Sequence, residues 1–231
     1  MTEQALENLQ KFVNGILSCK KEIKILEAGC GSTTYLKFEP KAYFVGIDIS
    51  GEQLARNNLL AEKIHGDIQT YPLTAIDYDV IVCWNVLEHV SRPQLALEKF
   101  SIALVPEGIL ILSLPNVLSL KGLITKFTPH IIHVLVHRYV YGNKDAGKDG
   151  TAPFKTYMRF IISPEKIVNF AEDHELRVVY LDYYDIQDYL RTRNRLFYQL
   201  YFTLSQIFGF LSFCKLGDSE FYIVLQKKGS G

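Results

Sequence analysis

A glycine-containing turn directly after an apolar strand constrains the fold of this chain more than any other feature. Residues 25–32 read ILEAGCGS, so the strand ends at Glu27 and is followed by Gly29 and Gly31. Glycine lets the backbone turn sharply and approach a ligand where a Cβ atom would clash. The pattern predicts a nucleotide-binding turn, although an ordinary strand-to-helix turn shares the same local sequence.

Three further segments follow at the spacing that such a pocket requires. A second strand ends in Asp48, about twenty residues after the turn, where an acidic side chain can accept both ribose hydroxyls. Asp67 follows a short apolar stretch, and a buried strand stops at a polar cluster that begins with Asn85. Asp67 alone has an alternative role as the cap of a turn. Several elements at the right separation are nevertheless hard to obtain by chance.

At this point the chain resembles the class I S-adenosylmethionine (SAM)-dependent methyltransferases. The resemblance is closest to the small-molecule branch with an LEHV-type segment, here residues 87–90, and it covers roughly residues 24–116 well. It implies SAM as the cofactor and S-adenosylhomocysteine as its product. Thr34 stands where a dinucleotide fingerprint requires glycine, which counts against a nicotinamide cofactor.

The resemblance also implies a set of cofactor-binding residues. Glu27 is expected to help hold the methionine amino group, Asp48 to bind the ribose hydroxyls, and Asp67 with Ile68 to flank the adenine. The complete expected set is Glu27, Gly29, Cys30, Gly31, Asp48, Ile49, Asp67, Ile68 and Asn85.

Strand and helix patterns alternate along most of the chain, which is typical of a doubly wound α/β fold. We expect a Rossmann-like, mostly parallel, seven-stranded sheet with an antiparallel C-terminal edge strand and an inserted cap. The predicted strands are 24–27, 43–48, 63–65, 80–84, 108–113, 176–185 and 220–228. The predicted helices are 3–17, 33–37, 51–62, 91–104 and 164–174.

The length of 231 residues suits one methyltransferase domain over residues 1–231. Regular alternation stops over 116–160, which we interpret as the inserted cap. A second, apolar insertion spans 190–215, and a connection that long is usually structured or functional. Its open interpretations are a substrate lid, a homodimer surface, a membrane-interface helix next to three arginines, or a buried core helix.

Composition narrows the class of protein. Lys plus Arg and Asp plus Glu both number 25, so the chain has no net charge and a nucleic-acid substrate is disfavoured. The four cysteines are far apart and fit reduced core residues of a cytosolic protein. No secretory signal pattern opens the chain. We therefore expect a cytoplasmic protein, with peripheral contact at the inner membrane face as an open alternative.

His89 is the candidate general base. It follows the fourth strand of the series, and an unperturbed histidine pKa of about 6.5 suits proton abstraction near neutral pH. A histidine that only lines the pocket or packs a helix is an equal alternative. The preceding Glu88 either orients His89 or caps the local helix.

The cap supplies aromatic and basic residues that can grip an acidic or aromatic substrate. Tyr139, Tyr157 and Arg159 are the substrate-binding candidates, and a solvated basic face is the alternative. His130, His133 and His137 are spaced i, i+3 and i+7 and could therefore share one face of a helix, which would suggest zinc. No carboxylate or cysteine lies beside them to complete a metal site. Related quinone and RNA methyltransferases place a metal on an E-x-x-E-H cluster, whose first position here is Asn85. No metal is therefore predicted.

These features together predict a SAM-dependent methyltransferase with a small-molecule acceptor. Methyl transfer from a sulfonium mainly requires alignment of the nucleophile and removal of its proton. The preferred reaction is O-methylation of a small or medium-sized apolar, aromatic or lipid-linked sugar acceptor. The alternatives are C- or N-methylation of a natural product, or a SAM-binding subunit without turnover.

Overall fold

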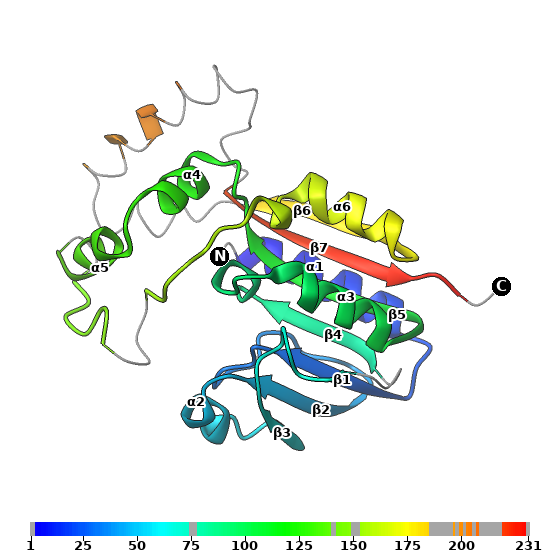
Figure 1. The fold of residues 1–231 in the computed structure, drawn as a ribbon. Helices are drawn as coiled ribbons and strands as arrows, with labels where there is room; N and C mark the ends of the chain where they lie inside the picture. Colours follow the sequence, from blue (N-terminus) through cyan, green and yellow to red (C-terminus); the bar gives the residue numbers. More distant parts are fainter. Residues whose placement is uncertain are drawn as a thin grey trace.

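A seven-stranded sheet organises the part of the chain that the computed structural model describes. This part comprises residues 3–73, 78–139, 142–148, 153–184, 196, 199–200, 202–204, 207 and 219–229. The strands are β1 (Glu22–Ala28), β2 (Lys41–Asp48), β3 (Glu62–His65), β4 (Tyr78–Trp84), β5 (Leu104–Pro115), β6 (Leu176–Tyr184) and β7 (Glu220–Lys227). Their order is β3-β2-β1-β4-β5-β7-β6, which confirms the doubly wound fold (Figure 1).

The strand order reverses between β1 and β4. The chain runs outward from β1 through β2 to β3 and then returns to place β4 on the other side of β1. All four strands are parallel, with Glu27 of β1 opposite Gly46 of β2 and Val82 of β4. In open α/β sheets the crevice outside the carboxyl ends at such a reversal is the usual ligand site.

The C-terminal strand β7 runs antiparallel, as expected, and lies second from the edge of the sheet. It pairs with β5 on one side and with β6 on the other. Every residue from Glu220 to Gln226 is buried, whereas in β6 only the two end residues, Leu176 and Tyr184, are buried. A strand that is apolar on both faces belongs inside the sheet, so β6 takes the edge.

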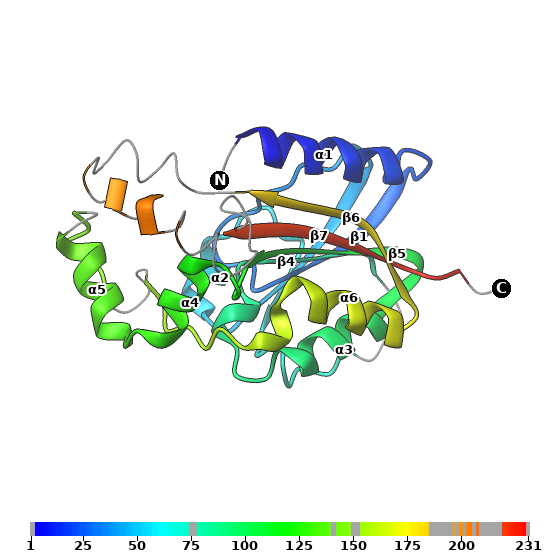
Figure 2. The same cartoon turned by 90° about the horizontal axis from the view of Figure 1, so that it is seen from above.

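Helices cover both faces of the sheet (Figure 2). Helix α1 (Glu3–Leu17) lies on one face, and α3 (Pro93–Ala103) and α6 (Pro164–Asp173) lie on the other. The buried side chains of α1 recur every four residues at Ala5, Leu9, Val13 and Leu17, which puts them on one face of the helix. Side chains of β4 alternate between the two cores because successive strand residues point to opposite faces.

Two predicted helices differ from the structure. Residues 33–37 form no regular helix, because β-branched residues start the segment and the hydroxyl of Thr34 bonds to Glu27 instead. The helix predicted over 51–62 is α2 (Gly51–Arg56), which ends at Asn57, whose side chain accepts from the Leu59 amide at 3.2 Å. Asparagine competes with helical hydrogen bonds in this way and favours a turn.

The cysteines divide between core and surface. Cys30 and Cys83 are buried and free, as expected of reduced core residues. Cys19 is exposed, because it lies in the turn between α1 and β1, and this corrects the expectation for that position. Cys214 lies outside the described residues.

The cap lies beyond the carboxyl ends of the parallel strands (Figure 1). It contains α4 (Leu120–Phe127) and α5 (His130–Tyr139), and residues 153–159 lead back towards α6. The Lys121 ammonium pairs with Glu220, and Lys126 Nζ donates to the Met158 carbonyl at 2.7 Å, so both ends of the cap are tied down. The predicted apolar insertion over 190–215 falls mostly outside the described residues.

Candidate functional site

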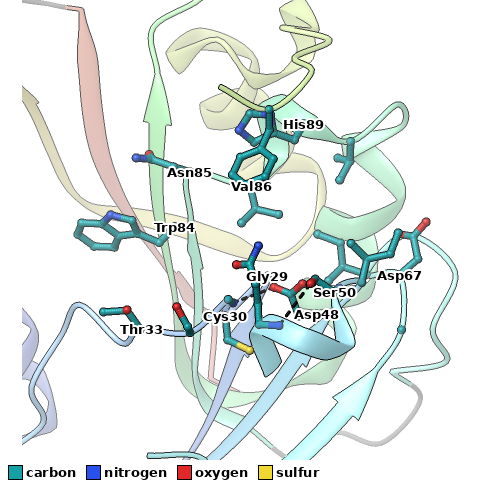
Figure 3. Close-up of a pocket in the computed structure, with 18 of the residues that line it drawn as sticks. Gly29, Cys30, Thr33, Asp48, Ser50, Asp67, Trp84, Asn85, Val86 and His89 are labelled. Carbon is teal, nitrogen blue, oxygen red and sulfur yellow. Dashed lines mark hydrogen bonds between the residues drawn. The ribbon is translucent and has the colours of Figure 1, made fainter. Parts of the chain in front are cut away.

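A cavity of about 740 Å³ opens at the reversal point of the sheet (Figure 3). Such a volume is typical of small-molecule sites. Most of its wall comes from the turns that follow β1, β2, β3 and β4, and Phe154 comes from the cap. The lining residues are Gly29, Cys30, Gly31, Ser32, Thr33, Tyr35, Asp48, Ile49, Ser50, Gln53, Gly66, Asp67, Ile68, Gln69, Trp84, Asn85, Val86, His89, Val90 and Phe154.

The glycine turn forms the floor of the cavity. Gly29 and Gly31 have φ angles of +73° and +50°, a left-handed conformation that other residues rarely adopt. A Cβ atom on Gly29 would lie 2.4 Å from a methyl carbon of Val86. Glycine at this position therefore lets the turns after β1 and β4 approach each other.

Asp48 is fixed by backbone amides on both sides. Its Oδ2 accepts from the Gly31 amide at 2.8 Å and its Oδ1 accepts from the Ser50 amide at 2.7 Å. A carboxylate has about four lone-pair sites, so two amide bonds leave acceptor capacity on each oxygen. The structure thus presents an oriented carboxylate that can accept hydroxyl donors from the cavity.

Asp67 has the turn-capping role that the sequence offered as an alternative, and its expected contact with an adenine stays a prediction. It lines the cavity, and it also caps the turn after β3, since Oδ1 accepts from the Gln69 amide at 2.8 Å. Gln69 Oε1 in turn accepts from the Ser91 hydroxyl and the Arg92 amide. The turn after β3 is therefore linked to the segment that precedes α3.

Asn85 follows β4 in a strained backbone conformation. Its φ is +52°, which asparagine tolerates better than most residues. Its amide donates to the Ser113 carbonyl at 3.0 Å, and its side-chain oxygen accepts from the Ser113 hydroxyl at 2.9 Å. These two bonds to β5 set the direction of the Asn85 amide group at the cavity wall.

His89 lies at the cap side of the cavity. Its Nδ1 is 2.9 Å from the carbonyl oxygen of Lys155, and a carbonyl only accepts, so Nδ1 carries the proton and Nε2 has the free lone pair. Burial lowers the pKa of His89 below its ordinary value, which favours the neutral ring. The Phe154 ring approaches His89 edge-on, with centroids 6.0 Å apart.

Glu88 is held in place through its backbone. Its carbonyl accepts from the amides of Tyr157 and Met158, which pins the cap segment to the turn after β4. Its carboxyl Oε1 lies 3.8 Å from His89 Nε2, beyond hydrogen-bond distance. Burial raises the pKa of Glu88 to about 8, so the carboxyl is mainly neutral at pH 7.

Glu27 lies beside the cavity and is not one of its lining residues. It is buried, and its Oε2 accepts from the Thr34 hydroxyl at 2.7 Å. Burial raises the pKa of this carboxyl to about 7, and the Thr34 bond opposes that rise. The expected contact with a cofactor amino group therefore remains a prediction.

The three substrate candidates of the cap do not line the cavity. Tyr139 is 82% exposed on α5, and Tyr157 and Arg159 are also exposed. Tyr157 contributes its backbone amide to Glu88, while its ring lies near the cations of Lys155 and Arg159. Their role in acceptor binding stays a prediction, and none of the three side chains lines this cavity.

Three aromatic residues that sequence reasoning missed do line the cavity. Tyr35 and Trp84 stack with ring centroids 5.2 Å apart and an interplanar angle of 14°, and Phe154 lies near His89. The position of Trp84 directly before Asn85 was a usable signal for a wall residue. No local pattern marks Phe154, because the cap places it.

Metal-ligand geometry is not found in the described part of the chain, where no group of three or more His, Cys, Asp or Glu is arranged to hold an ion. His130, His133 and His137 all lie on α5. His133 Nε2 instead lies 2.8 Å from the Thr128 hydroxyl.

Known proteins share both sequence and fold with this chain. A family model described as a methyltransferase domain matches residues 1–180. A ubiquinone biosynthesis O-methyltransferase of Nitrobacter winogradskyi is 32% identical over 111 residues, which are 43% of this chain and 41% of that protein. The chain thus spans less than half the length of the curated relatives it matches.

Solved structures agree at the level of the fold. A SAM-dependent methyltransferase from Archaeoglobus fulgidus has a TM-score of 0.58 at 15% identity, covering 96% of this chain and 94% of that one. The magnesium protoporphyrin IX methyltransferase of Synechocystis, solved with bound SAM, has a TM-score of 0.52 at 11% identity, with coverage of 96% and 79%. With a methyltransferase family model matched over most of its length and a doubly wound sheet that carries the cavity at its reversal point, the chain belongs to the SAM-dependent methyltransferases.

Proposed function

We propose that this protein transfers the methyl group of SAM to a hydroxyl oxygen of a small or medium-sized apolar acceptor, either aromatic or a lipid-linked sugar. The observation that carries the proposal is the state of His89. Its Nδ1 is committed to the Lys155 carbonyl, so a neutral Nε2 is available as a base at the cavity. A hydroxyl nucleophile needs such a base in order to lose its proton.

The residues around the cavity fit the cofactor. Gly29 and Gly31 bring the turn after β1 to the cavity, and Asp48 has acceptor capacity for two ribose hydroxyls. Asp67 and Ile68 line the cavity and are the residues proposed to flank the adenine, and Cys30, Ile49 and Asn85 also line it. SAM, when bound, supplies a methyl group on a positively charged sulfur.

Each group of residues at the cavity then has its own proposed role. Asp48 and the glycine turn orient the cofactor, Trp84 and Phe154 offer apolar surface to the acceptor, and His89 removes the hydroxyl proton at Nε2. Relatives named as ubiquinone biosynthesis O-methyltransferases support oxygen as the methylated atom. The acceptor walls are aromatic, which supports an apolar acceptor.

The proposed location is the cytoplasm, and the proposed partner is the small-molecule acceptor. The buried free thiols of Cys30 and Cys83 support a reducing compartment. Within the described part of the chain, no helix is long and apolar enough to cross a membrane. Membrane contact or a homodimer through 190–215 remains a prediction.

The test is methyl transfer from isotope-labelled SAM to a panel of aromatic alcohols and polyprenyl-linked sugars, with matched amines in place of the hydroxyls. Labelled ether products identified by mass spectrometry are expected. Products methylated on nitrogen or carbon would instead support the N- or C-methyltransferase alternatives. Saturable SAM binding by calorimetry with no product from any acceptor would favour a SAM-binding subunit without turnover.

A further inference from the structure

The cap exposes a concentration of large apolar side chains. Phe127 on α4 is 72% exposed, and Ile131 and Tyr139 on α5 are 61% and 82% exposed. Ile131, Leu135 and Tyr139 are four residues apart, so they share one face of α5. Single exposed apolar residues are ordinary on protein surfaces, but a contiguous set marks an interaction site.

The same segment is strongly basic. Residues 116–160 contain seven Lys and Arg and two Asp, a net charge of +5, so the remainder of this neutral chain carries −5. Neither α4 nor α5 contains an Asp or Glu. Arg138, Lys144, Lys155 and Arg159 are all exposed. The cap is therefore net positive, and the rest of the chain is net negative.

This combination selects one kind of partner. Polynucleotides attract basic side chains but gain little from exposed Ile, Leu and Phe. A second copy of the cap would bring two segments of charge +5 together, which like-charge repulsion disfavours. A surface with anionic headgroups over acyl chains satisfies both the basic and the apolar side chains.

We propose that the cap helices α4 and α5 dock on the surface of an anionic lipid bilayer. Phe127, Ile131, Leu135 and Tyr139 enter the headgroup region, and the exposed cations of the cap face the lipid phosphates. With eight and ten residues, α4 and α5 lie on the bilayer and do not span it. This inference goes beyond the proposed function and does not depend on it.

Docking on this side has a consequence for the cavity. Phe154 lines the cavity and Lys155 holds His89 through its carbonyl, so the docking segment and the site share one stretch of chain. A docked cap brings the cavity close to acceptors that partition into the bilayer. This consequence alone rests on the proposed function.

The test is flotation of the purified full chain with vesicles of phosphatidylcholine alone and of phosphatidylcholine with phosphatidylglycerol. No acceptor or SAM is needed, so a failure of methyl transfer leaves the result intact. We expect binding to the phosphatidylglycerol vesicles that weakens between roughly 50 mM and 500 mM salt, because salt screens surface charge. Binding to phosphatidylcholine alone is expected to be much weaker.

Two matched pairs of variants locate the surface. Ile131→Ser on α5 is expected to weaken vesicle binding about tenfold through loss of buried apolar area, whereas Ile102→Ser on α3, a residue that is 54% exposed, should have no effect. Lys144→Glu should weaken binding at least about fivefold, whereas Lys166→Glu on α6 should not. All four residues are partly or fully exposed, and circular dichroism verifies that the variants fold.

Three results would overturn the proposal. The first is no vesicle binding at low salt. The second is equal weakening by Ile131→Ser and Ile102→Ser, which would remove the cap as the contact. The third is a wild-type dimer in light scattering that Ile131→Ser converts to a monomer, which would assign the apolar face to a second copy of the chain.

Discussion

The two halves of the cavity are built in different ways. The half towards β1, β2 and β3 consists of strand ends whose polar groups are bonded to backbone amides, as at Asp48. The half towards the cap is completed by Lys155, which lies 66 residues from the His89 ring it holds. A half fixed by one sheet suits a constant ligand, and a half completed by a distant segment suits an acceptor that differs between proteins of one fold.

The acidic residues at and beside the cavity differ in their hydrogen-bond donors. Asp48 accepts hydrogen bonds from two backbone amides, whereas burial raises the pKa of Glu27 to about 7 and that of Glu88 to about 8. Hydrogen bonds to a charged group favour its charge, and burial without enough of them opposes it. Acidic residues at one site therefore serve different purposes according to their donors.

The largest expected effect is a loss of turnover when His89, in the half of the cavity towards the cap, is replaced. His89→Ala should lower kcat by about 10² to 10⁴ while leaving SAM affinity nearly unchanged. His133→Ala is the matched control, because this histidine bonds to Thr128 and does not line the cavity. Because the pKa of His89 is lowered, the acid limb of the activity should lie below the ordinary histidine pKa. Wild-type turnover in His89→Ala would remove its role as base.

In the half towards β1, β2 and β3, a comparable loss is expected in SAM binding. Asp48→Ala should weaken SAM affinity on the order of 100-fold, because two hydrogen bonds from ribose hydroxyls to the Asp48 side chain disappear. Calorimetric titration measures this, with Asp182→Ala on the edge strand β6 as the control. Unchanged affinity in Asp48→Ala would place the cofactor elsewhere.

A smaller effect, on the KM for the acceptor, is expected to distinguish aromatic residues that line the cavity from those that do not. Phe154→Ala should raise the KM for the acceptor about tenfold, less than full burial of a phenylalanine would give, because the ring is 45% exposed. Tyr139→Ala should leave the KM unchanged. An equal rise in both variants would mean that the cap closes over the acceptor and would restore Tyr139 as a binding residue.

The smallest expected effect is a pH dependence of SAM binding, in the half towards β1, β2 and β3. If Glu27 contacts the amino group of the cofactor, it must be ionised, so SAM affinity should fall as pH drops. With a pKa of about 7, the fall from pH 7.5 to 6.5 is about threefold. The Glu27→Gln variant should bind SAM with little dependence on pH. A flat profile in the wild type would rule out the contact.

The raised pKa values of Glu27 and Glu88 predict that the stability of the ligand-free fold falls as pH rises, which is opposite to the expected change in SAM affinity. A carboxyl whose folded pKa exceeds its unfolded value contributes most below the unfolded pKa, and the contribution is lost as pH rises through the folded one. Between pH 5 and 8, ionisation of Glu27 and Glu88 should therefore lower the melting temperature, as thermal unfolding would show.

Sequence reasoning succeeded where local rules act. Gly29, Asp48, Asp67, Asn85 and His89 were placed after strands of a parallel sheet, and parallel strands end at one edge, so the structure brings them to one cavity. It failed over residues 33–37, where a helix was expected. There, a bond from Thr34 to a buried carboxylate competes with helix formation, and only the fold shows that the carboxylate is within reach.

The sequence by itself determined the sheet, the glycine turn and the acidic residues that follow or end its strands, because apolar periodicity and the spacing from strand to turn are local properties. Only the tertiary structure decided that β7 lies inside β6, that Phe154 and not Tyr139 reaches the cavity, and which nitrogen of His89 is basic. Each of these depends on contacts between segments far apart in the chain, and such contacts are set by packing, which local patterns do not encode.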